Sequence, residues 1–284
     1  MEIKVCGSVA PYPQKDSNCS SFLITEDDNR VLLDCGPGST SQLDAYRELR
    51  NLAIIISHYH PDHYSDIFAL ANASYVYHNL GYLDKELDVY LPKPDMFRKP
   101  IPGVDKDGWG TCDYVDAPIE DYDFIKNMKH EHYMKFFDYQ DESKVDIGNM
   151  HITFKRTKHS IITYSSKIES PNGTIVYSAD TGYNGNNLES FAKNADVLIC
   201  EASFLRGQTR SSDYHLYAHE AGKIAAQANV KNLIIFHTWP EIAKEEYVKE
   251  AQEYFSNTYA LDEGEKIILD NKKVLIKENK EEVK

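Results

Sequence analysis

The stretch HYHPDH, residues 58–63, constrains the fold more than any other part of the chain. It follows the strand-like apolar run LAIIIS. His58 and His60 lie two positions apart, so in an extended segment their side chains project to the same side and can bind one ion. A helix-like run then begins, which places Asp62 and His63 where they can face a second ion. Imidazole and carboxylate groups bind zinc, iron and manganese, and zinc is favoured where nitrogen dominates. The pattern predicts a metal site at a strand end.

Short runs rich in β-forming residues alternate with helical runs, which indicates an α/β fold. The first half reads as the strands SSFLIT, RVLLDCG and LAIIIS, followed by a helical DIFALANA. The second half shows a similar order in MHITFKR, YSSKIE, TIVYSAD, DVLICEAS, the helical AHEAGKIAAQANV and NLIIFH. Two halves of similar pattern predict stacked sheets. A last helix is expected over PEIAKEEYVKEAQEYF, with Pro240 in its first turn, where the missing N–H costs nothing.

Three further polar residues end strand-like runs. His159 follows MHITFKRTK, Asp180 ends TIVYSAD, and His237 ends NLIIFH. Strand ends can meet at one edge of a sheet, so these side chains are candidates for the same metal site. A carboxylate that bridges two divalent ions lets both polarise one water, which makes hydroxide available near neutral pH. The arrangement predicts hydrolysis.

Charge and cysteine content bear on partners and compartment. Lys and Arg total 31 against 45 Asp and Glu, a net charge of −14, so nucleic acid is a disfavoured partner although not an excluded one. The five cysteines form no CxxC pair, which argues against a disulfide framework and a thiolate zinc site. No stretch reaches the roughly 18 apolar residues of a membrane span. We expect a cytoplasmic protein without membrane contact.

These motifs resemble, in order, those of the metallo-β-lactamase superfamily. HYHPDH matches its H-x-H-x-D-H signature, and TKHS, YSADTG and IIFHT are similar to its later metal-binding motifs. The resemblance is closest to the ribonuclease Z-like branch, on NCSSFLI, VLLDCGPG, LICEASF and HLYAHEAGKIAAQANVKNLIIFHT. LICEASF departs from the H-E-A-T segment of that branch, because Cys200 replaces the histidine. The resemblance implies a four-layer αββα sandwich that spans residues 1–284 as one domain.

The resemblance also implies two divalent metal ions and their ligands. Zinc is the expected metal, with manganese and iron as alternatives. The implied ligands are His58, His60 and His159 for one ion, Asp62, His63 and His237 for the other, and Asp180 between them. The remaining histidines are expected to be structural or solvent-facing: His78, His130, His132, His151 and His219.

By the same resemblance, Glu201 and His215 would form a carboxylate–imidazole pair that delivers a proton to the leaving oxygen. Cleavage of a phosphodiester requires stabilising a departing alkoxide, and a histidine held by a carboxylate can act as the general acid. With Asp62, these two are the predicted catalytic residues. Asp34 is expected to brace the site by hydrogen bonds that orient ligand imidazoles. The alternative is a turn-forming aspartate before Gly36.

The substrate prediction depends on a departure from true ribonuclease Z. That family carries a basic arm for tRNA, commonly between the third metal motif and the bridging aspartate, whereas here His159 and Asp180 are only 21 residues apart. The extra material lies instead in an expected insertion around residues 84–144, which is acidic and aromatic, as in DKDGWGTCDYVDAPIEDYDF. Such a segment repels a phosphate backbone. It would wall a pocket, pack against a partner chain or form a solvated loop.

The predicted function is therefore a dinuclear metal-dependent hydrolase of small phosphodiesters, such as a cyclic nucleotide or a short oligonucleotide end, acting through a metal-bridging hydroxide. A tRNA 3′-end endonuclease of the ribonuclease Z type is the second hypothesis. The third, from another class, is a metal-binding module without turnover. The sequence leaves the oligomeric state open, and a homodimer is compatible with it.

Overall fold

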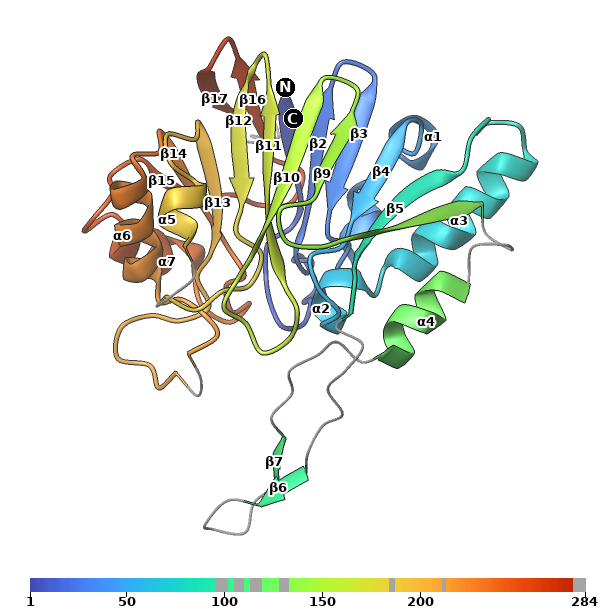
Figure 1. Cartoon of the computed structure of the whole chain (residues 1–284). Coiled ribbons are helices and arrows are strands. Elements are labelled where there is room, and N and C mark those ends of the chain that lie inside the picture. Colours follow the sequence, from blue (N-terminus) through green and yellow to red (C-terminus); the bar gives the residue numbers. More distant parts are fainter. Residues whose placement is uncertain are drawn as a thin grey trace.

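The computed structural model describes residues 1–94, 102–104, 110–112, 119–127, 133–183, 187–210 and 213–277. Two mixed sheets stack at the centre of the molecule, and helices lie on the outer side of each sheet (Figure 1). The layers follow the order helix, sheet, sheet, helix. The expected α/β class and αββα sandwich are confirmed.

The first sheet has eight strands and is built from the first half of the chain together with its last hairpin. Its order is β17 (Lys273–Lys277), β16 (Lys266–Asp270), β1 (Glu2–Gly7), β2 (Ser21–Glu26), β3 (Asn29–Leu33), β4 (Leu52–Ile55), β5 (Leu87–Pro92) and β8 (Met134–Tyr139). β3, β4, β5 and β8 are parallel to one another, and the other neighbours are antiparallel.

The second sheet has seven strands from the second half of the chain. Its order is β15 (Thr258–Ala260), β14 (Asn232–Phe236), β13 (Val197–Glu201), β12 (Gly173–Tyr177), β11 (Tyr164–Ser170), β10 (Met150–Arg156) and β9 (Lys144–Ile147). β12 to β15 are parallel, whereas β9 to β12 form an antiparallel meander. The repeated strand order that the sequence suggested therefore corresponds to two sheets.

The helices divide between the two outer faces. On the first sheet lie α3 (Ile67–Asn79) and α4 (Ile119–Asn127), and on the second α5 (Leu188–Phe191), α6 (Ala218–Ala228) and α7 (Lys244–Ala251). Shorter elements are η1 (Ser39–Gln42), α1 (Ala45–Glu48), α2 (Pro61–Tyr64) and a hairpin of β6 (Pro102–Val104) and β7 (Gly110–Cys112). Within the described ranges, none of the helices has the length and apolar character needed to cross a bilayer.

Three buried clusters hold the layers together. The central cluster joins the inner faces of both sheets, for example through Phe22, Phe154 and Phe236. Each outer cluster joins a sheet to its helices, as with Leu70 of α3 and Ile224 of α6. Sheets that are covered on both faces need apolar side chains at successive positions, which explains continuous runs such as LAIIIS.

The last helix begins later than the sequence suggested. Pro240 was expected in its first turn, but α7 begins at Lys244. Pro240 instead lies in a turn that the Ile242 amide closes by donating to the Trp239 carbonyl at 3.1 Å. Proline favours the second position of such a turn because its φ is already set. Pro240 therefore belongs to the loop that precedes α7.

The expected insertion around residues 84–144 is described only in part. β5 and β8 fall within these bounds and extend the first sheet, and α4 packs beside them. Residues 95–101, 105–109, 113–118 and 128–132, which hold most of the acidic aromatic stretch, lie outside the described residues. The boundaries and the role of the insertion stay predictions.

Candidate metal centre

The candidate ligands lie at one edge of the sandwich, where both sheets present strand ends. Within the described residues, His58 follows β4, His159 follows β10, Asp180 follows β12, and His237 follows β14. Strands β10, β12 and β14 run in the same direction, so their ends meet at this edge. The chain after β4 turns into the short helix α2, which carries Asp62 and His63 on its first turn.

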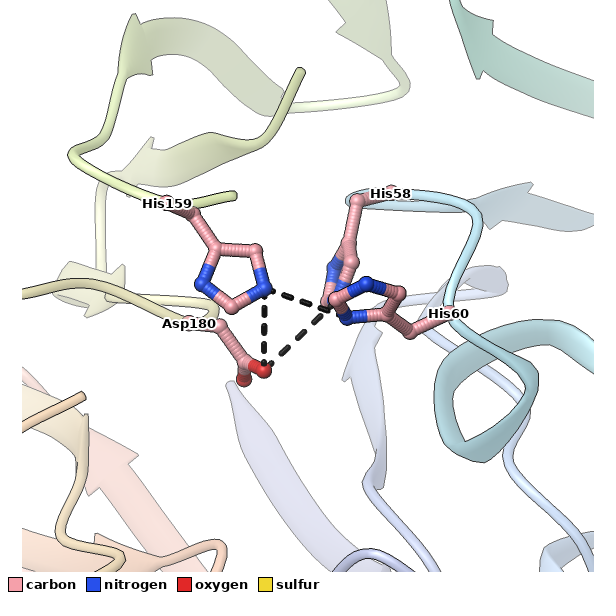
Figure 2. Close-up of side chains that lie close together, drawn as sticks. All are labelled: His58, His60, His159 and Asp180. Carbon is pink, nitrogen blue, oxygen red and sulfur yellow. Dashed lines mark hydrogen bonds and ion pairs between the residues drawn. The ribbon is translucent and has the colours of Figure 1, made fainter. Parts of the chain in front are cut away.

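The first ligand group consists of His58, His60, His159 and Asp180 (Figure 2). His60 Nδ1 lies 3.1 Å from His58 Nε2 and 3.1 Å from His159 Nε2. Asp180 Oδ2 lies 3.6 Å from His58 Nε2 and 3.7 Å from His159 Nε2. The first two histidines come from the β4–α2 segment, and the other two side chains reach toward them from the second sheet. One donor atom of each side chain thus faces a common point.

The second ligand group consists of Asp62, His63 and His237. His237 Nε2 lies 3.4 Å from Asp62 Oδ2 and 3.2 Å from Asp180 Oδ2. His63 Nε2 lies 3.2 Å from the other oxygen of Asp180, Oδ1. Asp180 therefore stands between the two groups and offers an oxygen to each.

The chemistry of these groups fits divalent metal ions. His63 Nε2, His237 Nε2 and Asp180 Oδ1 are buried, and the 3.2 Å approaches to Asp180 do not have hydrogen-bond geometry, so the described residues give these atoms no hydrogen bond. Buried polar atoms without a partner are rare because desolvation is costly. A divalent cation would satisfy nitrogen and carboxylate donors together. The fold and these groups imply divalent metal binding.

Burial and neighbouring charges set the protonation of the ligands without metal. Burial would raise the pKa of Asp180, but His237 and His63 outweigh it and hold that pKa well below its usual value. Burial opposes the charged form of His237, yet Asp180 and neighbouring carboxylates raise its pKa to about 10. The same balance raises the pKa of His63 well above its usual value. In the first group, burial lowers the pKa of His159 to about 3 and that of His58 well below its usual value. The second group therefore holds protons that a metal would displace.

Asp34 lies directly behind the ligands and is fully buried. Its Oδ2 accepts hydrogen bonds from His63 Nδ1 at 2.7 Å, the Ser57 hydroxyl at 2.7 Å and the Tyr177 hydroxyl at 2.6 Å. Its Oδ1 accepts from the Ser57 amide at 2.6 Å. These contacts place the Asp34 carboxylate against the His63 ring, and its role in bracing a metal ligand stays a prediction.

Glu201 and His215 form a pair beside the two groups. His215 Nδ1 lies 3.0 Å from Glu201 Oε1 and 3.9 Å from Asp180 Oδ2. Glu201 is fully buried and also accepts the amides of Thr181 and Leu216. Burial opposes charge on His215, but Glu201 outweighs it and raises its pKa. The pair therefore holds a proton next to the ligands.

Three residues at strand ends near the site have left-handed backbone conformations. These are Asp34 with φ 59°, Ala179 with φ 49° and His237 with φ 63°. Residues other than glycine, asparagine and aspartate rarely adopt this region, which costs them about 1–2 kcal/mol each, so the strain lies at Ala179 and His237. Such strain is maintained only where the surrounding structure requires it, and it is common at functional sites.

Sequence reasoning missed the polar side chains that hold the ligand rings from behind. Ser57, Tyr177 and Ser203 all contact a ligand or its carboxylate partner. The only local signal was that Ser57 immediately precedes HYHPDH and Ser203 ends CEAS.

The other histidines were expected to be structural or solvent-facing. His219 pairs with Glu250 at 2.7 Å between α6 and α7, the exposed His151 pairs with Asp146 at 2.7 Å, and His78 stacks on Tyr133. None of these three belongs to a candidate metal group among the described residues. His130 and His132 lie outside the described residues.

Comparison with known proteins places these features in one family. A model of the metallo-beta-lactamase superfamily matches residues 15–133, and a beta-lactamase superfamily domain model matches residues 113–238. The probable metallo-hydrolase YhfI of Bacillus subtilis is 30% identical over 238 residues, covering 84% of this chain and 86% of the relative. A ribonuclease Z of Archaeoglobus fulgidus is 26% identical, covering 90% and 94%.

A solved structure agrees with the sequence relatives. The crystal structure of the metallo-beta-lactamase fold protein YhfI from Bacillus subtilis superimposes with a TM-score of 0.75 at 28% identity. The match covers 93% of this chain and 96% of that chain. The similarity thus extends over nearly the whole fold.

Proposed function

Because the chain belongs to the metallo-beta-lactamase superfamily of metal-dependent hydrolases, we propose that it binds two divalent ions and hydrolyses small phosphodiesters. The two ligand groups together comprise five imidazoles and two carboxylates. Since nitrogen dominates this set, zinc is the metal we expect, and manganese or iron could replace it. Bound there, two such ions would lower the pKa of a shared water and offset charge on the phosphoryl group.

The observation that carries the phosphodiesterase proposal is the Glu201–His215 pair. A diester expels an alkoxide, which needs a proton as its bond to phosphorus breaks. Glu201 engages Nδ1 of His215, so the proton would leave from Nε2. The His215 side chain is 22% exposed, whereas Glu201 is closed to solvent. The imidazole can therefore reach a substrate while the carboxylate holds its orientation.

The other residues would bind and position the reacting groups. Asp180 and Asp62, held as carboxylates by the neighbouring imidazoles, would bind metal and orient the attacking water. Asp34 would hold His63 in place from behind. Cys6, Cys19, Cys35 and Cys200 are buried and free, as suits a reducing compartment, and we place the activity in the cytoplasm.

A ribonuclease Z activity is the second candidate, because the Archaeoglobus fulgidus relative with that name aligns over nearly its full length. The local charge favours the smaller substrate. Lys158 lies beside His159, and the Arg210 guanidinium contacts the His215 carbonyl, yet both cations pair with Asp213 at 3.7 and 2.9 Å. The Asp213 carboxylate offsets the charge of both cations and so lowers the positive potential that a phosphate backbone would meet beside the site.

The direct test compares substrates in one buffer with matched metal loading. Bis(p-nitrophenyl) phosphate, cyclic nucleotides, a lactone, a β-lactam and a precursor tRNA are assayed across a salt series, and Asp180→Ala reports contaminating activity. We expect turnover of the small diesters that changes little with salt. Efficient, site-specific cleavage of the precursor tRNA would instead support the ribonuclease, and metal binding without any turnover would support a binding module.

A further inference from the structure

We propose that two serine hydroxyls, Ser57 and Ser203, select the ring tautomer of one histidine in each ligand group. By doing so they determine which nitrogen faces the metals. Neither serine is a ligand, and both act through a neighbouring imidazole as positioning residues. The inference rests on the proposed two-metal site.

The first hydroxyl lies between Asp34 and His58. Ser57 Oγ is 2.7 Å from Asp34 Oδ2 and 2.9 Å from His58 Nδ1. Ser57 is 1% exposed, and Asp34 and His58 are fully buried, so the described surroundings shield the contact from solvent. The far nitrogen of the same ring, His58 Nε2, points at Asp180 and His60.

The second hydroxyl repeats this arrangement on the opposite sheet. Ser203 Oγ is 3.0 Å from Glu201 Oε2 and 2.8 Å from His237 Nδ1. Ser203 and His237 are each 5% exposed. His237 Nε2 points at Asp62 and Asp180. Each ligand group thus contains one histidine joined to a buried carboxylate through a serine.

The direction of these hydrogen bonds follows from the number of protons available. A serine hydroxyl has one proton to donate, and an ionised carboxylate can only accept. The proton of each hydroxyl is therefore directed at Asp34 or Glu201. The hydroxyl must then accept from the imidazole, so Nδ1 carries a proton. When the ring is neutral, its lone pair lies on Nε2, the atom that faces the ligand group.

The arrangement also connects parts of the site that act together. Asp34 contacts His63 directly and His58 through Ser57, so one carboxylate orients a ring in each group. Glu201 contacts His215 directly and His237 through Ser203. Ser203 therefore joins the proposed proton donor to a proposed metal ligand, and its loss should disturb metal binding as well as turnover.

The test uses Ser57→Ala and Ser203→Ala, with Ser57→Thr and Ser203→Thr as variants that keep the hydroxyl. Ser165→Ala is the matched control, because Ser165 is 3% exposed and donates to the Ser178 carbonyl at 2.7 Å without contacting a ligand. Zinc affinity is measured by competition with a chelator, and stability by urea unfolding of zinc-free protein. We expect affinity to fall about 10–100-fold in the alanine variants, as for other partners of ligand histidines.

The threonine variants should recover most of that affinity, and Ser165→Ala should bind zinc as the wild type does. Unchanged zinc affinity in both alanine variants, or an equal loss in Ser165→Ala, would overturn the inference. A wild-type protein that never binds a second equivalent would refute the two-metal proposal instead.

A second measurement needs no variant. Nitrogen-15 spectra of the zinc-loaded wild type should show slowly exchanging protons on Nδ1 of both His58 and His237. Protons found on Nε2, or rapid exchange of the Nδ1 protons with water, would also overturn the inference.

Discussion

Replacing Asp34 by asparagine should destabilise the protein even without metal. The side chain is closed to solvent and accepts four hydrogen bonds of 2.6–2.7 Å, from Ser57, His63 and Tyr177. Asparagine has the same shape and, like aspartate, tolerates the left-handed backbone found here at φ 59°. The substitution therefore changes hydrogen bonding and charge while leaving the backbone conformation accessible.

The size of the stability loss follows from two N–H donors that the fold holds against the Asp34 carboxylate. The Ser57 amide points at Oδ1, and His63 Nδ1–H points at Oδ2. An amide has only one acceptor oxygen, so in either orientation its NH2 group faces one of these donors. A buried donor left without an acceptor costs about 1–3 kcal/mol, and the remaining bonds lose the added strength of an ionised acceptor. We expect a loss of about 3 kcal/mol in the free energy of unfolding.

The assay is urea unfolding in excess chelator, followed by zinc competition on the folded variant. Asp27→Asn is the control, because Asp27 also has a positive φ, 51°, but is exposed. Asp34→Asn should also weaken zinc binding about 10–100-fold. A loss of stability below about 1 kcal/mol, or one no larger than that of Asp27→Asn, would refute the reasoning.

Three further predictions concern the ligands and the proton donor. Asp180→Ala should reduce zinc binding in both groups, measured as metal per chain after dialysis; retention of two equivalents would contradict its bridging position. His215→Ala should keep its metal but lose about 10²–10⁴-fold in diester turnover, with a smaller loss for a nitrophenyl than for an alkyl leaving group. His219→Ala is the control, being another glutamate-paired histidine, and equal losses for both leaving groups would exclude the acid role. Because carboxylates raise the pKa of His237 to about 10 and that of His63 above its usual value, zinc must displace protons at pH 7, so affinity should increase with pH. Calorimetry of zinc binding in buffers of different ionisation enthalpy measures the number of protons released. A binding enthalpy that does not depend on the buffer would contradict this prediction.

The sequence predicted features that depend on short segments. HYHPDH sits where an apolar strand ends, so the placement of His58 and His60 on one loop follows from local pattern. His159, Asp180 and His237 could be proposed because each ends its own strand-like run, and parallel strands bring such ends to one edge. Two runs of strands with helices between them predicted stacked sheets, whereas the four-layer order was implied by the family resemblance.

Contacts between distant segments could not be predicted in this way. Ser203 and His237 are 34 positions apart, and their contact depends on the pairing of β13 with β14. The Tyr177 hydroxyl reaches Asp34 across the interface between the sheets, where any buried aromatic residue would have satisfied the pattern. Pro240 was compatible with a helix start and with a turn, and the structure has the turn, in which the Ile242 amide donates to the Trp239 carbonyl.

The candidate ligands come from both sheets, with His58 and His60 from the first and His159, Asp180 and His237 from the second. Ions bound among them would cross-link the two sheets, and thus the two halves of the chain. Metal ions bound there would stabilise only the folded protein, by an amount that grows with the logarithm of the free metal concentration. A cell short of metal would therefore hold more of this protein in partly opened forms, which proteases degrade. Its abundance, and not only its activity, should follow the metal supply.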